Sequence, residues 1–154
     1  MDRLPSFDVA ITPDARLTHE QVLGQPAIFY FYPKDSTPGC TREGQDFAAA
    51  WPELQRRGVL LHGVSRDSLR SHLNFQRKFE LPFPLIADSD ESLCAAFGVI
   101  GEKMMYGRKV RGIERSTFLF DGSGALFRSW RKVKVPGHVT EVLAAVAELP
   151  DQAA

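Results

Sequence analysis

Residues 27–47 have the sequence AIFYFYPKDSTPGCTREGQDF, and this stretch decides the fold. Its first six residues are continuously apolar or aromatic, which predicts a strand buried on both faces of a sheet. Thr37 is a favoured helix N-cap residue and Pro38 suits the first helical position, so a helix should begin there. The stretch therefore predicts a buried strand that turns directly into a helix, with Cys40 in the first helical turn.

The rest of the chain continues this alternation of strands and helices. We expect the first helix to run from Pro38 toward Arg57 and to be soft or kinked, because Gly44 and Pro52 lie inside it. The other expected elements are strands at 59–65, 85–87, 116–121 and 125–133, helices at 68–80, 90–97 and 139–149, a small hairpin or cover at 7–21, and a loop at 101–112. This order predicts an α/β fold with a central mixed β-sheet flanked by helices, compatible with a thioredoxin-like architecture.

Length and composition restrict the class of protein. The chain has 154 residues, 44% of them hydrophobic and 25% charged, which fits a single domain over residues 1–154. Nineteen Lys and Arg balance nineteen Asp and Glu, which argues against a protein that coats nucleic acid or an anionic membrane. The start of the chain lacks the apolar core of a signal peptide, and the run at 27–32 is far shorter than the ~20 residues of a membrane span. We expect a cytoplasmic protein without a nucleic-acid or membrane partner.

The charge is unevenly distributed along the chain. Residues 101–134 hold nine Lys and Arg against three Asp and Glu, a net charge of +6. Such a run is most often a solvated face. The functional alternative is a basic rim around an anionic substrate or partner.

Cys40 is the strongest candidate for a reactive group. The first amides of a helix lack partners inside the helix, and together with the helix dipole they favour negative charge, which a thiolate carries. Cysteines in such a position typically have a lowered pKa and are reactive. The turn also follows the carboxyl end of a strand, where α/β folds place their sites. The alternative is that Cys40 is a buried, inert cysteine.

Spacing separates several kinds of cysteine chemistry. A dithiol oxidoreductase needs a second cysteine after two intervening residues, where this chain has Glu43. A zinc site needs about four clustered Cys or His ligands, whereas the four histidines here are scattered. A Cys-His hydrolase could recruit His62 or His138 in space, but no local signature for such an enzyme is present.

The spacing Pro33-x-x-x-Thr37-x-x-Cys40 resembles the active-site motif of the peroxiredoxins. FYPKDSTPGCTREGQDF at 31–47, MYGRKVRGIERSTFLFD at 105–121 and WRKVKVPGH at 130–138 are similar to the bacterioferritin-comigratory, or peroxiredoxin Q, group. The resemblance therefore spans nearly the whole chain. It implies a thioredoxin fold and reduction of hydroperoxides through a cysteine, without metal or haem.

The resemblance also implies a role for each motif residue. Cys40 would be the peroxidatic cysteine, whose thiolate attacks the terminal peroxide oxygen and becomes sulfenic acid. Thr37 would hold the peroxide and stabilise charge moving onto the leaving oxygen, and Arg115 would stabilise both the thiolate and that charge. Pro33 would shield the pocket from water, and Glu43, one helical turn from Cys40, would orient Arg115.

The resolving cysteine of the two-cysteine members is missing at its usual positions. These members place it five or about thirty-six residues after the peroxidatic cysteine, where this chain has Gln45 and Gln76. The remaining thiol, Cys94, lies in a short apolar segment, where packing is the simpler interpretation. We expect a one-cysteine mechanism in which glutathione, a glutaredoxin or thioredoxin reduces the Cys40 sulfenate. The alternative makes Cys94 a resolving cysteine, within the chain after local unfolding or between chains.

The sequence thus predicts a thiol-dependent peroxidase for hydrogen peroxide and small organic hydroperoxides, present as a monomer or weak dimer. An alternative from another class is a redox sensor or chaperone-like binding module on the same fold, with Cys40 oxidised stoichiometrically. Catalytic turnover with a regenerating thiol distinguishes the two.

Overall fold

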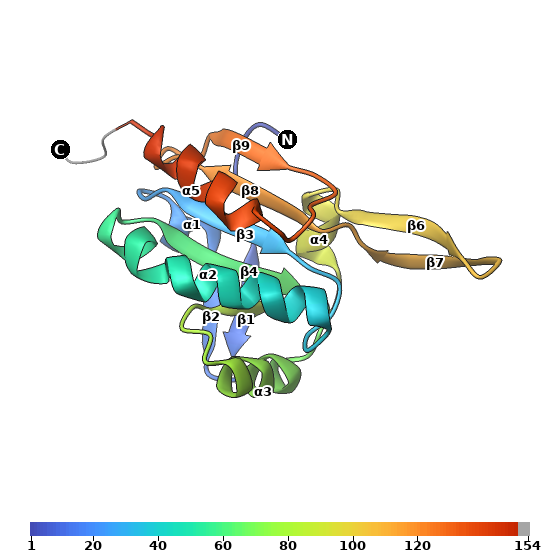
Figure 1. Cartoon of the computed structure of the whole chain (residues 1–154). Helices are drawn as coiled ribbons and strands as arrows, with labels where there is room; N and C mark the ends of the chain where they lie inside the picture. The colour runs from blue at the N-terminus through green and yellow to red at the C-terminus, as the bar shows by residue number, and fades with distance from the viewer. Residues whose placement is uncertain (151–154) are drawn as a thin grey trace.

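Strand β3 (Ala27–Phe31) lies inside a seven-stranded sheet in the computed structural model, which describes residues 1–150 apart from the side chains of Lys103 and Met105 (Figure 1). It pairs in parallel with β4 (Leu60–Ser65) and antiparallel with β8 (Ser116–Phe120). All five residues of β3 are buried. The continuous apolar run therefore forms the predicted two-faced core strand.

The sheet is mixed, as predicted, with the order β2-β1-β5-β4-β3-β8-β9. β3, β4 and β5 run parallel, while β1, β8 and β9 pair antiparallel with their neighbours. The expected cover at 7–21 is a hairpin, β1 and β2, that extends one edge of the sheet. The remaining strands of this sheet are β1 (Asp8–Thr12), β2 (Ala15–Thr18), β5 (Leu85–Ala87) and β9 (Leu126–Trp130).

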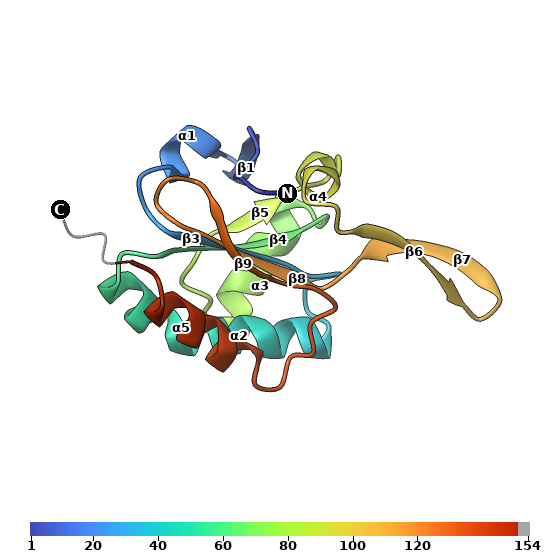
Figure 2. The same cartoon turned by 90° about the horizontal axis from the view of Figure 1, so that it is seen from above.

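Helices cover both faces of the sheet (Figure 2). One face carries α2 (Pro38–Arg56), α3 (Leu69–Phe79) and α5 (His138–Ala147). The opposite face carries α1 (His19–Val22) and α4 (Ser92–Ala96). No helix within residues 1–150 is both long and apolar enough to cross a membrane.

The alternation of side chains along β3 divides the core into two clusters. Ile28 and Tyr30 pack into the cluster beneath α2 and α5, which also contains Cys40. Phe29 packs into the cluster on the other face, which also contains Cys94. Successive residues of a strand point to opposite faces, so the sheet lies between the two cysteines.

Helix α2 is one uninterrupted element from Pro38 to Arg56, although we expected Gly44 and Pro52 to soften or kink it. At Gly44, a Cβ would lie only 3.3 Å from a methyl group of Leu81, so the missing side chain serves close packing. The helix ends where predicted, because Gly58 adopts the left-handed conformation just after it.

The prediction of a loop at 101–112 is wrong. These residues form a separate antiparallel hairpin, β6 (Ile100–Met105) and β7 (Arg108–Ile113), that projects from the body (Figures 1 and 2). Its two-residue turn, Tyr106-Gly107, has positive φ at both positions, which suits the twist of a hairpin. Both faces of the hairpin are largely exposed, so its sequence shows no apolar alternation.

Gly63 in β4 should not tolerate a side chain. A Cβ there would lie 2.6 Å from Cδ2 of Leu85 and 2.9 Å from the Tyr30 ring, both in the core. We expect Gly63→Ala to lower the free energy of unfolding by about 1–3 kcal/mol in denaturant titrations. The matched control is Gly101→Ala in β6, where a Cβ meets open space. Equal stability losses in the two variants would contradict this packing argument.

Candidate active site

The turn from β3 into α2 places Cys40 at the third residue of the helix. Thr37 occupies the N-cap position and Pro38 the first helical position, as predicted. Cys40 is only 2% exposed, at the base of this first turn. The open amides and positive dipole end of α2 therefore surround the sulfur and favour its thiolate form.

Arg115 reaches Cys40 from the segment between β7 and β8. Its Nη2 donates a hydrogen bond to Cys40 Sγ at 3.3 Å, and its Nη1 donates to Glu43 Oε1 at 2.7 Å. Glu43 lies on α2, one turn beyond Cys40, and is fully buried. The structure thus brings together three of the residues predicted from sequence, although 72 positions separate Glu43 from Arg115.

Arg115 keeps its positive charge although it is partly buried. Burial alone would lower the pKa of Arg115, but the neighbouring charges of Glu43 and Cys40 outweigh burial and raise it. The guanidinium therefore presents a fixed positive charge to the sulfur. A hydrogen bond from an ionised donor is about twice as strong as a neutral one, so this contact stabilises the thiolate over the thiol.

Glu43 is a buried carboxyl group, and only one of its two oxygens has a hydrogen-bond partner among residues 1–150. Burial raises the pKa of Glu43 to about 7, against the opposing effect of Arg115. Oε1 accepts from Arg115, whereas Oε2 has no hydrogen-bond partner among residues 1–150. The hydroxyl of buried Tyr30 is likewise without a partner in this part of the chain. Glu43 can therefore change protonation near neutral pH while it still accepts from Arg115.

Thr37 occupies the N-cap position without capping the helix through its side chain. Its hydroxyl donates instead to the backbone oxygen of Lys34 at 2.9 Å. The proton of the hydroxyl is thereby used, and the oxygen keeps lone pairs that can accept a hydrogen bond. Pro33 is exposed on the same turn, and its shielding role stays a prediction.

Gly39 is a site residue that the sequence reasoning missed. A Cβ at this position would lie 3.2 Å from Arg115 Nη2, tighter than ordinary packing allows. A side chain at this position would push the guanidinium a few tenths of an ångström from its place beside Cys40. The Pro38-Gly39 pair was visible in the sequence, but nothing in it indicated which side chain would approach.

The histidines considered for a Cys-His pair are engaged elsewhere. His138 shares a hydrogen bond with Thr117 at 2.8 Å, and burial followed by the charge of Arg115 lowers the pKa of His138 to about 4. His62 stacks on Phe29 in the other core cluster, and burial lowers its pKa to about 4 as well. Both rings are neutral at physiological pH, and these contacts give a Cys-His hydrolase no support.

Cys94 lies in surroundings opposite to those of Cys40. It is fully buried in α4, and its backbone N–H donates to Asp88 Oδ2 at 2.7 Å. Burial and the adjacent Asp88 carboxylate raise the pKa of the Cys94 thiol far above its usual range. A protonated thiol is a poor nucleophile, so these surroundings suit packing.

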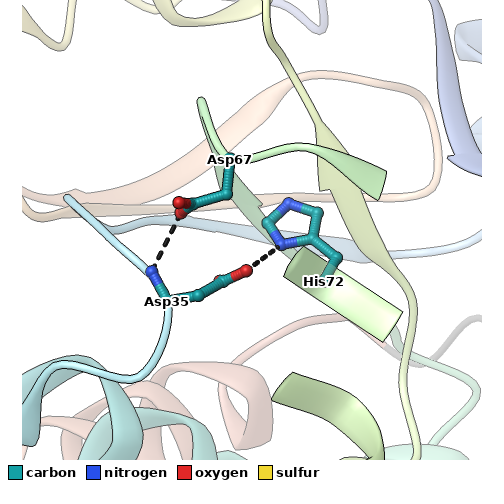
Figure 3. Close-up of side chains that lie close together, drawn as sticks. All are labelled: Asp35, Asp67 and His72. Atoms are coloured by element: carbon teal, nitrogen blue, oxygen red, sulfur yellow. Dashed lines mark hydrogen bonds and ion pairs between the residues drawn. The ribbon is translucent and has the colours of Figure 1, made fainter. Parts of the chain in front are cut away.

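A further group of side chains lies beside the β3–α2 turn (Figure 3). Ligand atoms of Asp35, Asp67 and His72 all lie within 4.8 Å of one another, a spacing that could hold a metal ion. Hydrogen bonds already engage all three residues, including both ring nitrogens of His72. The three side chains therefore form a hydrogen-bonded network.

This fold, with a cysteine and an arginine joined at the first turn of α2, defines the thioredoxin-like peroxiredoxin class. Residues 1–128 match the AhpC/TSA family, and the chain belongs to this family. Peroxiredoxin Bcp of Xanthomonas campestris is 58% identical over 123 residues, which cover 80% of this chain and 77% of the relative. Peroxiredoxin Bcp of Bacillus subtilis is 43% identical, with 84% and 82% covered.

Solved structures agree with this assignment. The bacterioferritin comigratory protein of Xanthomonas campestris superposes with a TM-score of 0.91 at 49% identity, covering 94% of this chain and 91% of that one. A cysteine-to-serine mutant of PrxQ from Xylella fastidiosa gives a TM-score of 0.90 at 42% identity, covering 96% and 94%. The resemblance to the bacterioferritin-comigratory, or peroxiredoxin Q, group is thereby confirmed.

The raised pKa of Glu43 predicts a pH-dependent stability. The pKa of the Glu43 carboxyl is about 7 in the folded chain, whereas its ordinary value, expected in the unfolded chain, is 4.5. Between about pH 4.5 and about pH 7 the folded state therefore binds a proton that the unfolded state has lost. The stability that this proton supplies is present below about pH 4.5 and is lost as the pH rises through about 7.

We therefore expect Glu43→Gln, which cannot titrate, to gain stability relative to wild type as the pH rises. The gain should approach about 3 kcal/mol between about pH 4.5 and about pH 8, measured by denaturant unfolding at each pH. His62 and His138 are present in both proteins, so their titration cancels in the difference. Parallel stability curves would show that Glu43 does not titrate in this range.

Proposed function

We propose that this protein is a thiol-dependent peroxidase that reduces hydrogen peroxide and small organic hydroperoxides through Cys40. The observation that carries this proposal is the hydrogen bond from Arg115 to the Cys40 sulfur at 3.3 Å, with Arg115 held by Glu43. The peroxiredoxin relatives support the peroxidase class.

The proposed reaction breaks one O–O bond and forms one S–O bond. The Cys40 thiolate attacks the terminal oxygen of the hydroperoxide, becomes sulfenic acid, and releases water or an alcohol once the departing oxygen has taken a proton. Arg115 stabilises the thiolate and then the charge on the departing oxygen. Thr37 accepts a hydrogen bond from the peroxide O–H, because its own proton is donated to Lys34. This role differs from our expectation that Thr37 would itself stabilise the leaving oxygen.

Organic hydroperoxides are included in the proposal because of one relative. The solved structure of the Xanthomonas campestris bacterioferritin comigratory protein concerns its alkyl peroxide reduction activity. That protein shares 49% identity and a TM-score of 0.91 with this chain. The same class of substrate is therefore proposed here beside hydrogen peroxide.

The proposed mechanism uses one cysteine and an external thiol. Cys40 and Cys94 belong to core clusters on opposite faces of the sheet, so a disulfide within one chain would require α2 or α4 to unfold and leave its face. Gln76, at one of the resolving positions of the two-cysteine members, donates to the backbone oxygen of Phe83 at 2.9 Å. A glutathione, glutaredoxin or thioredoxin thiol is the proposed reductant, and a cytoplasmic location would supply each of them.

The first test of this function is the intact mass after one equivalent of hydrogen peroxide, read without reductant. We expect a gain of one oxygen in the wild type and none in Cys40→Ser. Repeated turnover with an added thiol would separate the enzyme from a stoichiometric sensor. An unreactive wild-type Cys40 would overturn the peroxidase proposal.

The Cys94→Ala variant tests the one-cysteine mechanism. Because Cys94 is buried on the opposite face of the sheet, we expect the turnover rate with a thiol reductant to stay within about twofold of wild type, although core packing loses a small side chain. Loss of two hydrogens on oxidation of the wild type, or a covalent dimer that Cys94→Ala abolishes, would establish Cys94 as the resolving residue instead.

The β6–β7 hairpin is proposed as a contact surface for a protein reductant with an acidic surface. Tyr106 is 98% exposed, Met104 is 67% exposed, and Arg108 and Lys109 are exposed beside them. The hairpin leaves the body at the end of the molecule where α2 begins, two residues before Arg115 (Figures 1 and 2). A protein that approaches Cys40 would contact the basic and apolar side chains of the β6–β7 hairpin.

Charge reversal on the hairpin should weaken that contact. For the double variant Arg108→Glu with Lys109→Glu, we expect the KM for a reduced thioredoxin to rise about tenfold at low salt, and to respond less to added salt. The rate with dithiothreitol, a small thiol, should not change. The matched control is Arg16→Glu on β2, at the far edge of the sheet. An unchanged KM in the hairpin variant would show that the reductant docks elsewhere.

A further inference from the structure

A buried carboxyl group lies in the turn that carries the proposed peroxide site. Asp35 lies between β3 and α2, and its side chain makes three hydrogen bonds, of which Figure 3 shows the one to His72. The partners are the Tyr32 hydroxyl at 2.6 Å, the Ser71 hydroxyl at 2.8 Å and His72 Nδ1 at 2.7 Å. Both carboxyl oxygens of Asp35 therefore have partners, and these contacts fix the orientation of the side chain.

His72 completes a buried hydrogen-bonded pair with this carboxyl group. The ring belongs to α3 and is fully buried, with Nδ1 on Asp35 and Nε2 on the backbone oxygen of Ile86 at 2.9 Å. A backbone oxygen only accepts, so Nε2 carries a hydrogen, and one further proton is held between Nδ1 and the Asp35 carboxyl group. Removing one partner of this pair leaves the other as a buried polar group without its partner.

The backbone of the turn is tied to the same neighbourhood. The N–H of Asp35 donates to Asp67 Oδ2 at 2.9 Å, and the same oxygen accepts from the Ser65 hydroxyl at 2.6 Å. Ser65 ends β4, and Asp67 lies between β4 and α3. Both the side chain and the main chain of Asp35 are therefore fixed to elements outside the turn.

The residues on either side of Asp35 connect it to the peroxide site. Lys34 precedes it and supplies the backbone oxygen that holds the Thr37 hydroxyl at 2.9 Å. Ser36 follows it in the left-handed region, at φ 64, a conformation that is strained in a residue other than glycine. Such a conformation persists only where its surroundings hold it. The fixed Asp35 supplies that restraint.

We propose that Asp35 and His72 are positioning residues of the peroxide site, an inference that rests on the proposed peroxidase function. Their buried hydrogen bond holds the β3–α2 turn so that the Lys34 carbonyl orients the Thr37 hydroxyl toward the peroxide. They touch neither Arg115 nor Glu43 in the hydrogen-bonded network, so the thiolate and its cation are held separately.

Two reactions of Cys40 distinguish positioning from general stabilisation. Reaction with hydrogen peroxide needs the thiolate and a correctly placed Thr37, whereas alkylation by iodoacetamide needs only the thiolate. In His72→Gln we expect the second-order rate constant with hydrogen peroxide to fall at least about tenfold, since small misplacements in a site have large kinetic effects. The alkylation rate should stay within about twofold of wild type.

A matched control and a double-mutant cycle sharpen the test. His62→Gln also replaces a buried histidine, but on the opposite face of the sheet, and should leave both rates unchanged. Thr37→Val should lower the peroxide rate while sparing alkylation. When His72→Gln is added to Thr37→Val, the peroxide rate should fall by less than about twofold further, because His72 acts through Thr37.

Three outcomes would overturn the inference. They are an equal fall of the peroxide and alkylation rates in His72→Gln, an unchanged peroxide rate in that variant, and a full tenfold effect of His72→Gln in the Thr37→Val background. If His72→Gln does not fold, the double variant Asp35→Asn with His72→Gln removes both ionisable groups of the pair and is judged by the same two rates. A wild-type Cys40 that reacts with iodoacetamide but not with peroxide would refute the proposed function itself.

Discussion

The guanidinium of Arg115, shared between the Cys40 sulfur and the Glu43 carboxylate, is the interaction on which the site depends. Cys40 is 2% exposed, and a negative charge on its sulfur would be costly unless a positive charge lay beside it. The helix start supplies part of that charge, and Arg115 supplies the rest from a distant segment. Gly39 leaves room for the guanidinium, because a Cβ there would lie 3.2 Å from Arg115 Nη2. The position of Cys40 therefore depends on both the first turn of α2 and the ion pair of Arg115 with Glu43.

The sheet assigns the two cysteines to separate environments. Cys40 lies on the face covered by α2 and α5, where open amides and Arg115 favour the thiolate. Cys94 lies on the other face, where Asp88 and burial favour the thiol. Both cysteines lie in helices, but the surroundings of Cys40 favour the thiolate and those of Cys94 favour the thiol. The cysteines are separated because α2 and α4, the helices that carry them, pack against opposite faces of the sheet.

The sequence correctly predicted the features that depend on residues close together in the chain. The buried strand, the N-cap position of Thr37 and the first-turn position of Cys40 all follow from neighbouring residues. The hairpin at 100–113 was missed because its exposed faces carry no apolar period, and only Tyr106-Gly107 marked its turn. The pairing of Asp35 with His72, 37 positions apart, depends on how parallel strands bring a turn and a helix together, and no local pattern encodes it.

The isolation of Cys40 from any thiol on its own face has a consequence for the chemistry of its oxidised form. Under the proposed one-cysteine mechanism, encounters with external thiols would set the lifetime of a Cys40 sulfenic acid, and a second peroxide molecule would compete for the same sulfur to give the irreversible sulfinic acid. The fraction of molecules lost in each cycle would then follow the ratio of peroxide to reducing thiol around the protein. With Cys94 buried on the opposite face of the sheet, the share of Cys40 in the sulfinic state would report that ratio cumulatively.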